Sequence, residues 1–74
     1  IVRNVVKGMF IYSLMWRESM ILADLPSYVN RIGVHREYNA QFFKMSEEAF
    51  ADWLVTEALR AGKARVDGGR LIAL

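Results

Sequence analysis

The chain contains no cysteine, one proline and one histidine, and it has no long uncharged stretch. Without cysteine there can be no disulfide, thiol nucleophile or thiolate metal site, and in so short a chain this favours an intracellular, cytoplasmic setting over a secreted one. A single histidine cannot build a histidine-rich metal site. The longest uncharged run, residues 8–16, is much shorter than the roughly 20 apolar residues of a membrane-spanning helix, so we expect no membrane segment.

Catalytic and cofactor signatures are also missing. No nucleophile, base and orienting group occur at a recognisable spacing. The Asp67-Gly68-Gly69 stretch lacks the lysine and the serine or threonine that follow in a phosphate-binding loop, so it is better explained as a turn. We therefore expect a chain without enzymatic activity, without a cofactor and without a metal ion.

The sequence is rich in hydrophobic residues. Of its 74 residues, 54% are hydrophobic, which argues against disorder and for one domain, residues 1–74, with a dense core. The net charge is +2, and this mildly basic balance permits nucleic-acid binding without requiring it.

Residues 2–23 predict a helix, because apolar side chains recur along them at helical spacing. Residues 9–12 are apolar on every side of that helix, and a helix of this kind is normally buried all round. Two interpretations stay open: a central core helix with a few exposed apolar side chains, or a helix that also contacts a second copy of the chain or another protein. Residues 20–23 are compatible with a short strand. The predicted interface residues are Phe10, Ile11, Leu14 and Met15.

Two further segments are bounded by proline and glycine. Asp24-Leu25-Pro26 has the features of a helix start, since aspartate can cap a helix and proline is tolerated in its first turn. This helix is expected to run to about Ile32 and to stop at Gly33. Residues 35–45 fit a short helix, a loop or an extended segment.

The last third of the chain predicts a helix followed by a β-hairpin. Residues 46–61 form the helix, because Ser46 is a suitable N-cap and Gly62 is a natural C-terminal stop. Residues 63–74 form the hairpin around a two-residue turn at Gly68-Gly69. This turn sets a register that groups small apolar residues on one face and lets two opposite charges pair across the strands. The predicted strand partners are Asp67 with Arg70, Val66 with Leu71, and Ala64 with Ala73.

Residues 45–74, MSEEAFADWLVTEALRAGKARVDGGRLIAL, show an amphipathic helix that ends in Ala-Gly-Lys and passes directly into the hairpin. This pattern, with helices before it, resembles the winged-helix superfamily, a variant of the helix-turn-helix. The resemblance implies an α+β, mainly helical domain of three or four helices followed by a C-terminal β-hairpin wing. It also implies DNA binding, although other winged helices bind only proteins, because fold alone does not fix function.

The helix that a winged helix normally inserts into the major groove is acidic in this chain. Residues 46–61 carry four acidic side chains and one arginine, a net charge of −3 that phosphates repel. A second stretch, residues 28–36, resembles the turn of a helix-turn-helix with Gly33 at the turn, although Val29 and Asn39 depart from that pattern. Base reading would then fall to residues 35–44, since Arg suits guanine and Asn or Gln suit adenine. Its candidates are His35, Arg36, Asn39, Gln41 and Lys44.

The hairpin is the more favourable contact with nucleic acid. Its three cations against Asp67 give a local charge of +2, and a basic hairpin can clamp phosphates. The alternative is that these are ordinary solvated charges. We favour a non-enzymatic protein that binds nucleic acid, as double-stranded DNA, and forms a homodimer through its N-terminal helix. The alternative function is a protein-interaction module that uses this helix and the acidic helix 46–61. The predicted nucleic-acid contacts are Arg31, Arg36, Asn39, Lys44, Lys63, Arg65 and Arg70.

Overall fold

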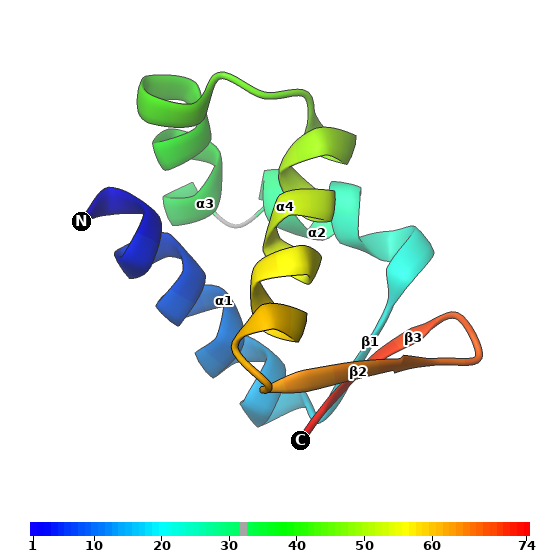
Figure 1. The fold of residues 1–74 in the computed structure, drawn as a ribbon. Helices are drawn as coiled ribbons and strands as arrows, with labels where there is room; N and C mark the ends of the chain where they lie inside the picture. Colours follow the sequence, from blue (N-terminus) through cyan, green and yellow to red (C-terminus); the bar gives the residue numbers. More distant parts are fainter. Residues whose placement is uncertain (32) are drawn as a thin grey trace.

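Residues 1–31 and 33–74, the part described by the computed structural model, form four helices and one three-stranded antiparallel sheet (Figure 1). This confirms the predicted α+β, mainly helical class with a C-terminal hairpin. The elements are α1 (Val2–Arg17), β1 (Ser19–Ile21), a 3-10 turn (Leu22–Asp24), α2 (Leu25–Arg31), α3 (Gly33–Tyr38), a π-helical turn (Asn39–Phe43), α4 (Glu47–Arg60), β2 (Ala64–Asp67) and β3 (Arg70–Ala73).

The sheet joins the two ends of the sequence, with β3 in the middle, β2 on one side and β1 on the other. α1 ends at Arg17, and Glu18 turns the chain with a positive φ of 71°. Met20 then lies opposite Leu71 in the antiparallel β1–β3 pair. In this pair β1 forms backbone hydrogen bonds along one edge of β3. The prediction of one helix over residues 2–23 is therefore wrong for residues 18–21, whereas residues 22–23 belong to the 3-10 turn. The alternative of a short strand near residues 20–23 agrees with β1.

Two short helices and a turn connect the sheet to α4. α2 begins directly after Asp24, as predicted, and ends at Arg31, while the predicted end at Ile32 falls outside the described residues. Gly33 opens α3, which continues into the π-helical turn. The side-chain amide of Asn39 closes this turn. It accepts a hydrogen bond from the Met45 backbone N–H at 2.9 Å and donates one to the Met45 carbonyl oxygen at 2.8 Å.

α4 has the predicted boundaries to within one residue at each end. The Ser46 Oγ accepts a hydrogen bond from the Ala49 N–H at 3.1 Å, so Ser46 caps the helix. Gly62 follows the last turn with a φ of 69°, a conformation that favours glycine. These short-range signals explain why the sequence defines this element well.

The hairpin has the predicted register, in which Asp67 lies opposite Arg70, Val66 opposite Leu71, and Ala64 opposite Ala73. The predicted ion pair between Asp67 and Arg70 is wrong. Asp67 pairs instead with Arg65 at 3.1 Å, because residues two apart on one strand share a face. Arg70 therefore has no ion pair with Asp67, and its guanidinium donates a hydrogen bond to the Ser19 Oγ instead.

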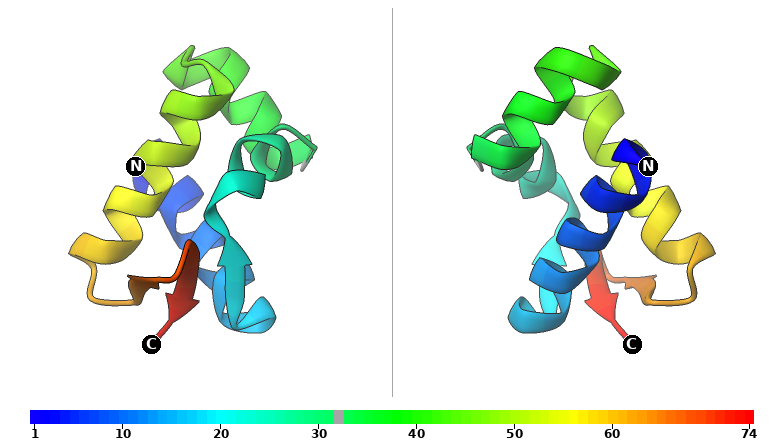
Figure 2. Two further views of the ribbon diagram at one scale, coloured as in Figure 1. Left: turned by 90° about the vertical axis from the view of Figure 1, so that its right-hand side faces the viewer. Right: turned by 90° about the vertical axis from the view of Figure 1, so that its left-hand side faces the viewer.

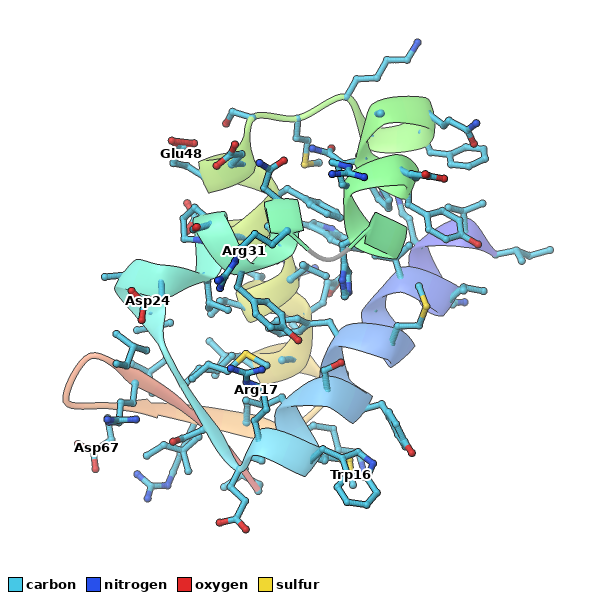
Figure 3. All side chains as sticks on the ribbon, turned by 180° about the vertical axis from the view of Figure 1, so that it is seen from behind. Trp16, Arg17, Asp24, Arg31, Glu48 and Asp67 are labelled. Carbon is cyan, nitrogen blue, oxygen red and sulfur yellow. The ribbon has the colours of Figure 1, made fainter. Side chains whose placement is uncertain are left out.

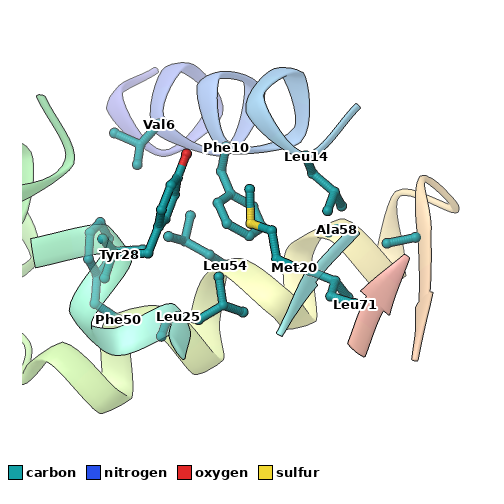
Figure 4. Close-up of a cluster of buried hydrophobic side chains, with 13 residues drawn as sticks. Val6, Phe10, Leu14, Met20, Leu25, Tyr28, Phe50, Leu54, Ala58 and Leu71 are labelled. Carbon is teal, nitrogen blue, oxygen red and sulfur yellow. The ribbon is translucent and has the colours of Figure 1, made fainter. Parts of the chain in front are cut away.

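The core lies where α1, α2, α4 and the sheet meet, and Figure 4 shows its side chains converging. Phe10 and Leu14 of α1 are fully buried in it, so they serve the domain's own core and offer no exposed surface to a partner. This corrects half of the predicted interface set. Ile11 is partly buried and packs against the core, whereas Met15 is 54% exposed.

The sheet lies at one end of the helices, and α3 with its following turn lies at the other end (Figure 2). In the described ranges no helix has both the length and the apolar character needed to cross a membrane.

Candidate nucleic-acid interface

A positively charged hollow lies between the C-terminal end of α1, β1, α2 and the start of β3, on the face seen in Figure 3. Its volume is about 210 Å³. Three arginines line it together with Asp24 and Tyr28, and we call it the arginine pocket. The full lining is Arg17, Ser19, Met20, Ile21, Asp24, Leu25, Tyr28, Arg31 and Arg70.

Each arginine reaches the arginine pocket from the end of a different element. Arg17 is the last residue of α1, and its guanidinium carbon lies 5.0 Å from the centre of the Tyr28 ring, which is a cation–π distance. Arg31 is the last residue of α2. Arg70 is the first residue of β3, and its Nη1 donates to the Ser19 Oγ of β1 at 3.3 Å. The fold thus gathers cations that are far apart in the sequence.

The arginine pocket carries a net charge of +2, from three arginines against Asp24. The ion pairs within the described residues are Arg60–Glu57 and Arg65–Asp67, and neither involves a pocket arginine. All three pocket arginines are exposed. A guanidinium in this state can donate two parallel N–H groups to a phosphate or carboxylate, so the pocket is suited to an anion.

The outer face of the sheet extends the positive surface from the arginine pocket toward the hairpin. Cross-strand partners share a face, so the register places Arg65, Asp67 and Arg70 on one side of the sheet together with Ile21 and Ile72. Because Asp67 neutralises Arg65, the charge on this face that remains without a carboxylate partner is that of Arg70.

Three of the seven predicted nucleic-acid contacts, Arg31, Arg65 and Arg70, lie in the arginine pocket or on the outer face of the sheet. Arg31 and Arg70 line the arginine pocket itself. Arg65 lies on the outer face of β2, and Lys63 is exposed at the start of the hairpin. Arg31 and Arg70, which sequence analysis assigned to two separate segments, therefore line the same pocket.

The predicted base-reading segment, residues 35–44, is less suited to bases than its composition suggests. The Asn39 amide is engaged by the Met45 backbone. His35 is 2% exposed, so it presents no polar edge to a ligand. Arg36 and Lys44 are exposed, but they do not line the arginine pocket.

Arg17 is the pocket arginine that sequence analysis missed. The predicted helix ran to residue 23, which placed Arg17 inside a helix instead of at its end. No local signal indicates that the helix ends at Arg17. The residues after Glu18 form β1, and β1 pairs with β3, which lies more than 45 residues further along the chain.

The exposed face of α4 is acidic. Glu47, Glu48 and Asp52 are all exposed. Glu48 and Asp52 line a second hollow between α2 and α4, beside apolar residues such as Val55. A phosphate backbone placed against this face would meet charges of its own sign.

No family model, no curated protein and no solved structure matches this chain. Its candidate site is therefore defined by its own geometry. Across residues 1–31 and 33–74, no three histidine or carboxylate side chains are grouped so that they could hold a metal ion.

Proposed function

We propose that this chain is a non-enzymatic winged-helix variant that binds nucleic acid, as double-stranded DNA, through the arginine pocket and the outer face of the sheet. The observation that carries the proposal is the convergence of three arginines from α1, α2 and β3 beside a basic hairpin. The order of helix, strand, helices and hairpin, with β1 paired to β3, supports the winged-helix layout.

The chemistry of the arginine pocket fits a phosphate backbone. Duplex DNA carries about one negative charge per 1.7 Å of its axis, so a surface with several separated cations can contact more than one phosphate. Arg17, Arg31 and Arg70 come from three different elements and have no carboxylate partner among the described residues. Their charges are thus available to replace condensed counterions on DNA.

This docking differs from that of most winged helices, in which the helix before the hairpin enters the major groove. α4 holds that place in the chain order, and its acidic side chains oppose such an approach. Docking through the arginine pocket places the duplex on the face seen in Figure 3, where α2 lies in front of α4. Arg65 shares the outer face of the sheet with Arg70, so it can contact the same duplex, and Lys63 is exposed at the start of the hairpin. Phosphate contacts position a protein without reading bases, so binding with little sequence preference is expected.

Arg70→Ala is expected to weaken duplex binding about tenfold, the loss typical of one charge-assisted hydrogen bond. The slope of log affinity against log salt concentration should also fall in magnitude by about 0.9, since one phosphate contact is lost. Fluorescence anisotropy with a labelled duplex, repeated over a range of salt concentrations, measures both quantities.

Arg36→Ala is the matched control, because it removes the same exposed charge from α3, which lies outside the arginine pocket and at the end of the helices opposite to the sheet. Its affinity should stay within about twofold of the unsubstituted chain, as expected for an exposed charge distant from the ligand. Equal losses for the two variants would contradict the proposed interface. So would an unsubstituted chain whose duplex binding does not respond to salt.

A further inference from the structure

The arginine pocket is a hollow of limited size. Its volume of about 210 Å³ equals that of about seven water molecules, at about 30 Å³ each. A length of duplex cannot enter it, because the major groove of B-DNA alone is about 12 Å wide. The hollow instead has room for one phosphate group and part of the sugar attached to it.

Two of the three guanidinium groups in the pocket contact neutral partners that help to hold them in place. The Arg17 guanidinium carbon lies 5.0 Å from the centre of the Tyr28 ring. The Arg70 Nη1 donates a hydrogen bond to the Ser19 Oγ at 3.3 Å. Neither contact neutralises the arginine, and each guanidinium has five N–H donors, so donors remain for a ligand. Partners that hold a long side chain in place also reduce the entropy lost on binding, which favours a compact anion in this pocket.

The charge of the pocket matches that of a phosphate with a single ester bond. Three arginines against Asp24 give the pocket a net charge of +2. A phosphomonoester carries about −1.5 to −2 near pH 7 and has three free oxygens. A phosphodiester inside a DNA strand carries a single negative charge and has two free oxygens, so it would balance only part of the pocket charge. In nucleic acid the phosphomonoester occurs at the end of a strand.

The positive surface is too short to follow a duplex over many phosphates. Leu25 lines both the arginine pocket and the second hollow, which contains Glu48 and Asp52. The acidic face therefore begins on the other side of α2, and Figure 3 shows Glu48 beyond Arg31 in the direction away from the sheet. A strand that ends in the pocket avoids these carboxylates, whereas a duplex that continues past Arg31 would meet them.

We propose that the arginine pocket binds the terminal phosphate of a DNA strand, a proposal that rests on the duplex binding proposed above. The phosphomonoester enters the hollow, where Arg17, Arg31 and Arg70 donate hydrogen bonds to its three free oxygens. The phosphates that follow in the same strand lie along the outer face of the sheet, where Arg65 is exposed. This protein should therefore prefer duplex ends that carry a phosphate.

Two duplexes of one sequence test this preference, the first with hydroxyl groups and the second with phosphates at every strand end. Fluorescence anisotropy at constant salt concentration, with the fluorophore on an internal base, measures both affinities. The phosphate-ended duplex should bind at least about tenfold more tightly, the gain typical of a hydrogen bond to a charged group. Equal, salt-dependent affinities would overturn the recognition of the end and leave the proposed duplex binding in place. Absence of binding by both duplexes would contradict the proposed function as well.

Arg31→Ala removes one arginine from the pocket without changing the sheet. Arg31 is exposed at the end of α2, so the domain should keep its circular dichroism spectrum. The preference for the phosphate-ended duplex should fall below about threefold, since a charge-assisted contact to the terminal phosphate is lost. Arg36→Ala, in α3 and outside the pocket, is the matched control and should keep the full preference. An Arg31→Ala chain that folds normally and retains the full preference would contradict the placement of the phosphate in the pocket.

A phosphoserine peptide tests whether the pocket serves a phosphorylated protein instead, because it carries the same phosphomonoester on another polymer. At constant ionic strength, a DNA strand with terminal phosphates should displace the phosphate-ended duplex at a lower concentration than this peptide. The reason is that the peptide offers no further phosphates to the outer face of the sheet. Displacement by the peptide at the lower concentration would assign the pocket to a phosphorylated protein and overturn the proposal.

Discussion

Phe10→Ala is expected to remove most of the stability of the domain at room temperature. The Phe10 ring is fully buried in the core and meets the His35 ring edge to face with their centres 6.4 Å apart. Truncating a buried phenylalanine to alanine typically costs about 3–5 kcal/mol, through lost apolar burial and the cavity left behind. A domain of this size has a free energy of unfolding of only about 5 kcal/mol, so little stability would remain. Urea denaturation followed by circular dichroism measures the change.

Met15→Ala is the matched comparison, because Met15 lies on the same helix and is 54% exposed. Its free energy of unfolding should change by less than about 0.5 kcal/mol. Similar effects for the two substitutions would contradict the division of α1 into a buried face and an exposed face.

His35→Leu is expected to stabilise the domain. His35 is 2% exposed, and its ring lies between Phe10 and Tyr28, with centre distances of 6.4 and 6.5 Å. Neither ring nitrogen has a hydrogen-bond partner in the part of the chain that is described. A buried polar group without a partner costs about 1–3 kcal/mol, and leucine of similar size removes that cost. We expect the free energy of unfolding to rise by this amount at pH 8, as measured by urea denaturation.

The same substitution should change how stability depends on pH. Burial lowers the pKa of His35 below its ordinary value of 6.5, because the charged ring would lose its hydration. Below pH 6.5 the unfolded chain therefore binds more protons at this residue than the folded chain. Stability should fall as the pH falls from 6.5 toward the folded pKa, by up to about 1.4 kcal/mol per pH unit. His35→Leu should lose this component, and parallel profiles for the two chains between pH 7.5 and pH 5 would contradict the burial of an unpaired histidine.

Local signals in the sequence predict α4 and the hairpin well. The Ser46 cap, the glycine after the last turn and the Gly68-Gly69 turn each act within a few residues, so no tertiary information is needed to place them. β1 is different, because its three residues form a strand only where β3 is already present. The same long-range pairing decides where α1 ends.

The candidate site shows the same division between local and long-range information. Arg31 and Arg70 are evident as cations in the sequence, yet nothing local indicates that they line one pocket with Arg17. Asn39 suits base reading by residue type, whereas the fold uses its amide to hold the Met45 backbone. Phe10 and Leu14 share a helix with Met15, and only the packing of α4 and the sheet shows which face is buried.

The most direct test of the proposed interface is a nuclear magnetic resonance titration of the isotope-labelled chain with a short DNA duplex. Docking through the arginine pocket predicts that the largest backbone amide shifts occur around Arg17, in β1, at the end of α2 and around Arg70, and that they diminish with added salt. The amides along the exposed face of α4 should change little. Shifts concentrated along α4 instead, or no shifts at low salt, would contradict the assignment of this surface to nucleic acid.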